Sequence, residues 1–201
     1  MTIRSTSELM IQVSQLRAVI FDLDGTLIDS DEALIQPFLA LGMERDRITF
    51  GHPIEEACRE WGIDLARYVE LYDTTEAQPF AGAEALLQSL PVWAVCSNKH
   101  PVSGNAELNR LGWTPKVAFF SDAFNGAAKR CEPVIEALGL QPDQVIFVGD
   151  TEHDEACAGS AGCEFIWAGW NPRTAQQSPR GTSFASLGDL QQHLSQRFTE
   201  G

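Results

Sequence analysis

The chain has 201 residues, of which 44 % are hydrophobic, so it is long enough for one medium-sized domain with a buried core. Its formal net charge of −14 disfavours nucleic acid as a partner, and no apolar run approaches the roughly 20 residues of a membrane-spanning helix. Five cysteines without a CxxC pair argue against a disulfide framework or zinc ribbon, and with no secretory signal predicted we expect a cytoplasmic protein.

Apolar runs and helix-like segments alternate along most of the chain. The spacing of Leu9, Met10, Val13 and Leu16 predicts a short amphipathic helix ahead of the first strand. Buried strands are predicted at 18–22, 92–96, 117–120, 145–149 and 164–167, and helices at 83–90, 104–112, 132–139, 154–162 and 184–198. This alternation is typical of a doubly wound, Rossmann-like α/β fold with a parallel sheet.

The interval just after the first strand breaks this rhythm. It contains no predicted strand, but three helical patterns at 31–42, 53–62 and 65–78. We therefore expect an α-helical cap domain over residues 30–78 and an α/β core domain formed by residues 1–29 and 79–201. A helical insert at this place would lie above the carboxyl ends of the strands, where α/β sheets bind ligands.

Polar side chains follow three of the predicted strands. They are Asp22 and Asp24, then Ser97 and Asn98, then Asp150 with Asp154 one helical turn further on. The carboxyl ends of parallel strands meet at one edge of the sheet, so these side chains are expected to converge. Clustered carboxylates without histidine or cysteine nearby favour Mg²⁺.

A phosphate ligand would also need hydrogen-bond donors and positive charge. Ser97 offers a hydroxyl, and Lys129 stands just before a predicted helix, where a lysine can place its charge on a phosphate. Lys99 competes for the same role, and sequence spacing alone does not decide between the two lysines.

The order of these motifs is diagnostic. "DLDGTL" at 22–27, Ser97, Lys129 and "GDTEHD" at 149–154 together resemble the haloacid dehalogenase-like hydrolase superfamily, over residues 17–170. The helical insert resembles the small cap of its phosphoglycolate phosphatase and β-phosphoglucomutase-like branch. One departure is the third motif, which reads "KRCEP" where the family usually has Lys-Pro.

The resemblance implies a role for each matching residue. Asp22 would be the nucleophile that forms an aspartyl-phosphate, and Asp24 the general acid and base. Ser97, Asn98 and Lys129 would bind the phosphate; Asp22, Asp150 and the backbone carbonyl of Asp24 would bind Mg²⁺, with Asp154 supporting the metal site. The loop 49–56 resembles a cap loop that contacts substrate, with His52 as the candidate contact.

The implied activity is that of a Mg²⁺-dependent phosphatase, a phosphoric monoester hydrolase acting on a small phosphorylated metabolite such as phosphoglycolate or a sugar phosphate. A dehalogenase is disfavoured because that chemistry does not need Asp24. A phosphomutase with the same core and a catalytically silent binding protein remain alternatives, and intact Asp22, Asp24 and Asp150 argue against the silent protein. The sequence does not distinguish a monomer from a dimer.

Overall fold

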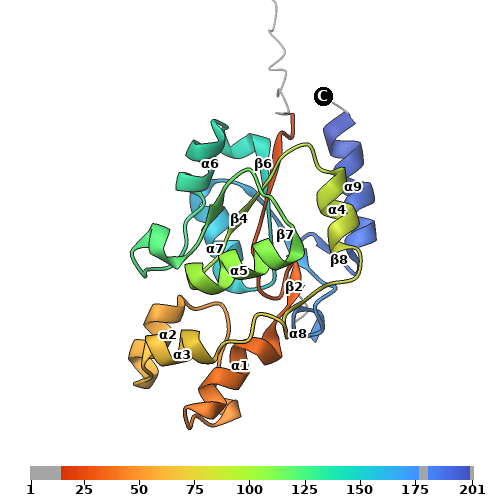
Figure 1. The fold of residues 1–201 in the computed structure, drawn as a ribbon. Coiled ribbons are helices and arrows are strands. Elements are labelled where there is room, and N and C mark those ends of the chain that lie inside the picture. The colour runs from red at the N-terminus through yellow and green to blue at the C-terminus, as the bar shows by residue number, and fades with distance from the viewer. Residues whose placement is uncertain (1–14, 177–180, 200–201) are drawn as a thin grey trace, which may run out of the picture.

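The computed structural model describes residues 15–176 and 181–199, so the helix predicted around Leu9 to Val13 lies outside the described residues. A six-stranded parallel sheet forms the centre, in the order β5-β4-β1-β6-β7-β8 (Figure 1). Its strands are β1 (Ala18–Phe21), β4 (Trp93–Cys96), β5 (Ala118–Phe119), β6 (Val145–Gly149), β7 (Glu164–Ala168) and β8 (Ser183–Phe184). The doubly wound α/β fold predicted from the sequence is confirmed.

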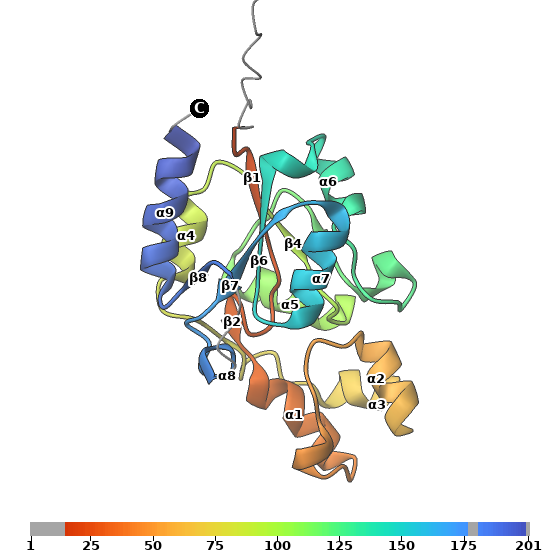
Figure 2. The same cartoon turned by 180° about the vertical axis from the view of Figure 1, so that it is seen from behind.

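Helices cover both faces of the sheet because successive side chains along each strand point to opposite faces. Val19 and Phe21 belong to one hydrophobic cluster, whereas Ile20 between them belongs to the other. The first face is covered by α4 (Ala83–Ser89), α5 (Pro101–Leu111) and α9 (Leu187–Thr199), and the second by α6 (Glu132–Leu138) and α7 (Glu152–Ala161), as Figures 1 and 2 show from opposite sides. The strands therefore read as continuous apolar runs.

Several boundaries differ from the sequence prediction. Helix α5 begins at Pro101, three residues early, because the ring of His100 accepts the Val102 N–H and proline suits the first helical turn. Helix α7 begins at Glu152, because Thr151 caps it. The helix predicted at 184–198 begins at Leu187, since Phe184 belongs to β8; this strand and α8 (Pro172–Gln176) are too short to show a periodic pattern.

A separate group of helices lies beyond the carboxyl ends of the strands (Figures 1 and 2). It contains α1 (Asp31–Ala40), α2 (Ile54–Trp61) and α3 (Leu65–Leu71), and we call residues 30–78 the helical insert. Its two ends are joined by a short antiparallel ribbon of β2 (Ile28–Asp29) and β3 (Gln78–Pro79), which the sequence pattern did not reveal. Whether the insert is a domain with the predicted boundaries stays a prediction.

The third helix of the insert is shorter than predicted. The pattern over 65–78 indicated one helix, but α3 ends at Leu71 and Tyr72 has extended backbone angles. The Asp73 carboxylate then accepts hydrogen bonds from the N–H and hydroxyl of Thr75, which closes a turn instead of another helical turn. This early ending places Tyr72 between the insert and the sheet.

Short 3₁₀ helices complete the structure at Arg45–Arg47, Ser121–Phe124 and Pro142–Gln144. Within residues 15–176 and 181–199, none of the helices combines the length and apolar character needed to cross a membrane.

Candidate active site

The chain turns sharply after β1. The Asp22 N–H donates to the Val148 carbonyl, which holds Asp22 in register with β6, and the Leu23 carbonyl then accepts the N–H groups of Leu27 and Ile28. Gly25 adopts a φ of +74°, and a Cβ atom there would collide with the carboxylate of Asp150. The glycine therefore allows the turn to lie directly against the end of β6.

Asp22 is buried beside a lysine and a second carboxylate. Lys129 Nζ lies 2.6 Å from Asp22 Oδ1 and 2.5 Å from Asp154 Oδ1. Burial raises the pKa of Asp22 to about 7; Lys129 opposes this shift, and the charges of Asp154 and Asp24 add to it. The lysine that sequence spacing left undecided is thus placed at Asp22, although its motif departs from the usual Lys-Pro.

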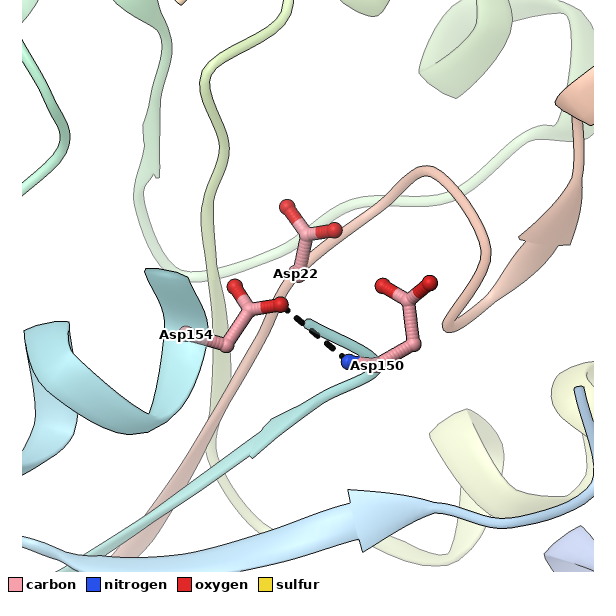
Figure 3. Close-up of side chains that lie close together, drawn as sticks. All are labelled: Asp22, Asp150 and Asp154. Atoms are coloured by element: carbon pink, nitrogen blue, oxygen red, sulfur yellow. Dashed lines mark hydrogen bonds between the residues drawn. The ribbon is translucent and has the colours of Figure 1, made fainter. Parts of the chain in front are cut away.

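Asp154 holds the loop that follows β6. Its Oδ2 accepts the N–H groups of Asp150 at 3.1 Å and Thr151 at 2.9 Å, and the Thr151 hydroxyl at 2.6 Å. Figure 3 shows the first of these bonds and the three aspartates facing one another. Asp154 therefore fixes the position of both Lys129 and Asp150.

Asp150 is fully buried, and sequence reasoning missed its principal partner. Arg173 Nη2 lies 2.6 Å from Asp150 Oδ2, and the same guanidinium pairs with Asp31 of the helical insert and lies over the Phe50 ring at 4.4 Å. Asn171 also donates to Asp150. Both residues follow the predicted strand 164–167. The sequence therefore held a signal for them, because polar side chains also follow the three strands that end before Asp22, Ser97 and Asp150.

Asp24 belongs to a second network around Lys99. Lys99 Nζ lies 2.7 Å from Asp24 Oδ1, 2.7 Å from the Tyr72 hydroxyl and 3.2 Å from Glu107 Oε2. Tyr72 in turn donates to Glu107 Oε1 at 2.6 Å. The carboxylate partners of Lys99 are therefore Asp24 and Glu107.

Glu107 is the unexpected member of this network. It is completely buried, and burial raises its pKa to about 7, against the lowering influence of Lys99. The sequence held a signal for it, because Gly104, Glu107 and Leu108 lie at the spacing of one helix face and that face is buried. A glutamate on an apolar helix face needs a partner, which here is Lys99.

The remaining predicted site residues line one cavity with Asp22 and Asp24. Ser97 is buried after β4. The Asn98 amide donates to the Gly51 carbonyl and accepts the Lys129 N–H, each at 2.8 Å, so it connects the helical insert with the Lys129 loop. His52 lies 2.9 Å from the Thr49 hydroxyl on the wall of a cavity that Asp22, Asp24, Ser97 and Lys129 also line.

The three buried aspartates have the chemistry of a site for a hard divalent cation. Asp22, Asp150 and Asp154 each place one carboxylate oxygen within 4.8 Å of the others. Among the described residues, Lys129 and Arg173 form ion pairs with these aspartates, and Arg173 is shared with Asp31. The three clustered groups offer carboxylate oxygens, the hard ligands that Mg²⁺ prefers, so these residues fit Mg²⁺.

Comparisons with known proteins show what this chain is similar to. Residues 19–168 match the model of the haloacid dehalogenase-like hydrolase family. A phosphoglycolate phosphatase of Xanthomonas campestris is 30% identical over 195 residues, covering 81% of this chain and 87% of the relative. A pyrophosphatase of Anoxybacillus flavithermus is 25% identical over 183 residues, covering 77% of this chain and 84% of that protein.

Solved structures show the same fold. The crystal structure of a predicted phosphatase from Clostridium acetobutylicum superposes with a TM-score of 0.74 at 19% identity, covering 91% of this chain and 100% of that one. A haloacid dehalogenase-like hydrolase from Bacteroides fragilis gives a TM-score of 0.72 at 20% identity, covering 88% and 100%.

Proposed function

The chain belongs to the haloacid dehalogenase-like hydrolase family, and from this premise we propose that it is a phosphatase that hydrolyses a small phosphate monoester through an aspartyl-phosphate on Asp22. The observation that carries the proposal is the pairing of two aspartates with two lysines. Lys129 contacts Asp22, and Lys99 contacts Asp24, so each carboxylate has its own cationic partner. Different partners suit the different tasks of a nucleophile and a proton-transfer group.

In the first step, a carboxylate oxygen of Asp22 attacks phosphorus, and the bond between phosphorus and the alcohol oxygen breaks. Asp24 gives its proton to the departing oxygen. Lys129 and the Ser97 hydroxyl bind the phosphoryl oxygens and hold them in line with Asp22. In the second step, Asp24 takes a proton from water, which attacks phosphorus and releases inorganic phosphate. The bond between phosphorus and Asp22 breaks in this step, which restores the Asp22 carboxylate. The overall reaction converts the phosphate ester and water into the alcohol and inorganic phosphate.

Magnesium is part of the proposal. Asp22, Asp150 and the Asp24 backbone carbonyl would hold it, and Asp154 would support them by fixing the loop of Asp150. When bound, Mg²⁺ would neutralise charge on the phosphate and on Asp22. This local positive charge would offset the negative charge of the whole protein, which otherwise repels an anionic substrate.

The helical insert is proposed to act as the cap over this site. Two contacts support this role: Arg173 on the core side pairs with Asp31 of the insert, and Asn98 donates to the Gly51 carbonyl of the insert. Cavity residues come from both sides, so a closed cap would exclude water and select the alcohol part of the substrate.

Turnover of 4-nitrophenyl phosphate with and without Mg²⁺ tests the proposal. Release of inorganic phosphate that depends on Mg²⁺ and is abolished in Asp22→Asn is expected. Absence of turnover in a folded, Mg²⁺-loaded protein would favour the silent binding protein instead.

A further inference from the structure

The helical insert presents an apolar wall to the reacting groups. The cavity that Asp22 and Asp24 line is also lined by large apolar or aromatic side chains of the insert, among them Leu34, Phe38, Ile48, Ile54, Trp61 and Tyr68. Three of them form a continuous aromatic group, because the Phe38 ring lies 5.1 Å from Trp61 and 4.4 Å from Tyr68. The substrate's alcohol part would face this wall while its phosphate faces Lys129.

The cationic side chains near the cavity are already engaged. Among the described lining residues, the two ammonium groups are those of Lys99 and Lys129, and both are buried and paired with carboxylates. Arg59 and Arg67, the arginines of α2 and α3, do not line the cavity, and Arg67 pairs with Glu70. Lys129 is assigned to the phosphate and Lys99 is held by Asp24 and Glu107, so among the described lining residues no unpaired lysine or arginine would meet a negative group on the alcohol part. Such a group would be desolvated against apolar side chains.

Polar side chains beside the apolar wall are few and partly engaged. Thr49 and His52 bond to each other, and His100 accepts the Val102 N–H. Each retains the capacity for a hydrogen bond to a hydroxyl or ether oxygen at the edge of the cavity. This capacity suits an alcohol with one polar atom better than a polyhydroxylated sugar.

From this wall we propose that the substrates of the enzyme are phosphate monoesters of uncharged, largely apolar alcohols, aromatic ones included. The proposal rests on the phosphatase function above and specifies its substrate class. It also distinguishes the expected substrate of this chain from that of its relative named phosphoglycolate phosphatase, because the glycolate part carries a carboxylate and the described cavity residues include no unpaired lysine or arginine to bind it. The chemical step is unchanged: the alcohol leaves with the proton of Asp24.

The test compares kcat/KM for benzyl phosphate and 2-phosphoglycolate in the Mg²⁺-loaded full-length protein. Both are esters of primary alcohols, so the leaving oxygen is of the same kind and the comparison reports the alcohol part. We expect benzyl phosphate to be preferred by at least about 10-fold, the lower end of the discrimination an apolar pocket gives. Glycerol 3-phosphate, which is hydroxylated but uncharged in its alcohol part, should also fall below benzyl phosphate.

A matched pair of variants tests whether the apolar wall causes the preference for benzyl phosphate over 2-phosphoglycolate. Trp61→Arg adds a cation to the cavity and is expected to reduce the ratio of kcat/KM values, benzyl phosphate over 2-phosphoglycolate, by about 10-fold or more. Leu71→Arg adds the same charge to the exposed side of α3, outside the cavity, and should leave the ratio unchanged.

Equal or better hydrolysis of 2-phosphoglycolate by the wild-type protein would overturn the substrate class while leaving the phosphatase function intact, and this result needs no variant to fold. An equal change of the ratio in both arginine variants would also overturn it. Failure to release phosphate from any of the three esters or from 4-nitrophenyl phosphate would instead contradict the proposed function.

Discussion

Replacing Glu107 by glutamine should change how the stability of the protein depends on pH. Glu107 is completely buried, and it contacts Lys99 and Tyr72 behind Asp24. Burial raises its pKa from 4.5 to about 7, even though the charge of Lys99 lowers it. In the unfolded chain the same carboxyl group has its ordinary value and ionises at lower pH. Glutamine keeps the size of the side chain but does not titrate.

The sign and size follow from this difference. Between pH 4.5 and 7 the folded protein binds more protons at Glu107 than the unfolded chain does, so stability falls as pH rises through this window. A shift of about 2.5 pKa units corresponds to roughly 3 kcal/mol of unfolding free energy. This stability is fully present below pH 4.5 and lost above about pH 7. The Glu107→Gln variant lacks this dependence.

Urea unfolding at a series of pH values from 4.5 to 8 measures the effect. Titratable groups that do not interact with Glu107 cancel in the difference between wild type and Glu107→Gln. We expect wild type to lose roughly 3 kcal/mol relative to the variant across the series. A difference that stays constant with pH would refute the reasoning, because it would mean that Glu107 titrates alike in the folded and unfolded states.

Three further predictions concern the site. Asp24→Asn should lower kcat by about 10²-fold or more through loss of proton transfer, with the circular dichroism spectrum unchanged; a normal kcat would assign the proton to another group. Gly25→Ala should lower the free energy of unfolding by at least about 1 kcal/mol, because the left-handed φ and the collision with Asp150 both oppose a Cβ; an unchanged urea midpoint would contradict this. Arg173→Met should tighten Mg²⁺ binding by about tenfold in calorimetry, since it removes a competing cation at Asp150; weaker binding would mean that Arg173 mainly positions the carboxylate.

The fold was predictable because its signals are local. Runs such as Val145–Gly149 are apolar at every position, and this pattern distinguishes a strand that is buried on both faces from one that faces water. Boundaries were less predictable because single contacts decide them, as the Asp73 turn does after α3. The two-residue strands β2, β3 and β8 exist only through pairing with distant residues, so the local pattern could not reveal them.

The candidate site was also predictable only in part: its aspartates were predicted, but most of their partners were not. Motif order and strand ends pointed to Asp22, Asp24, Asp150 and Asp154, and the structure brings all four to one edge. Their partners were harder to predict, because pairing of Lys129 with Asp22 or of Arg173 with Asp150 joins residues 107 and 23 positions apart. Only the tertiary fold determines which cation meets which carboxylate, and the catalytic roles remain proposals.

The claim that Asp22 carries the phosphoryl group is tested most directly by trapping the aspartyl-phosphate intermediate. The Asp24→Asn variant is mixed with 4-nitrophenyl phosphate and Mg²⁺, quenched in acid within one turnover, digested and analysed by peptide mass spectrometry, with Asp22→Asn treated in parallel. Because 4-nitrophenolate can leave without a proton from Asp24, whereas the variant lacks the group that activates water, the account predicts a phosphorylated peptide with the modification on Asp22, absent from Asp22→Asn. Phosphate on a different residue, or continued turnover in Asp22→Asn, would contradict the account.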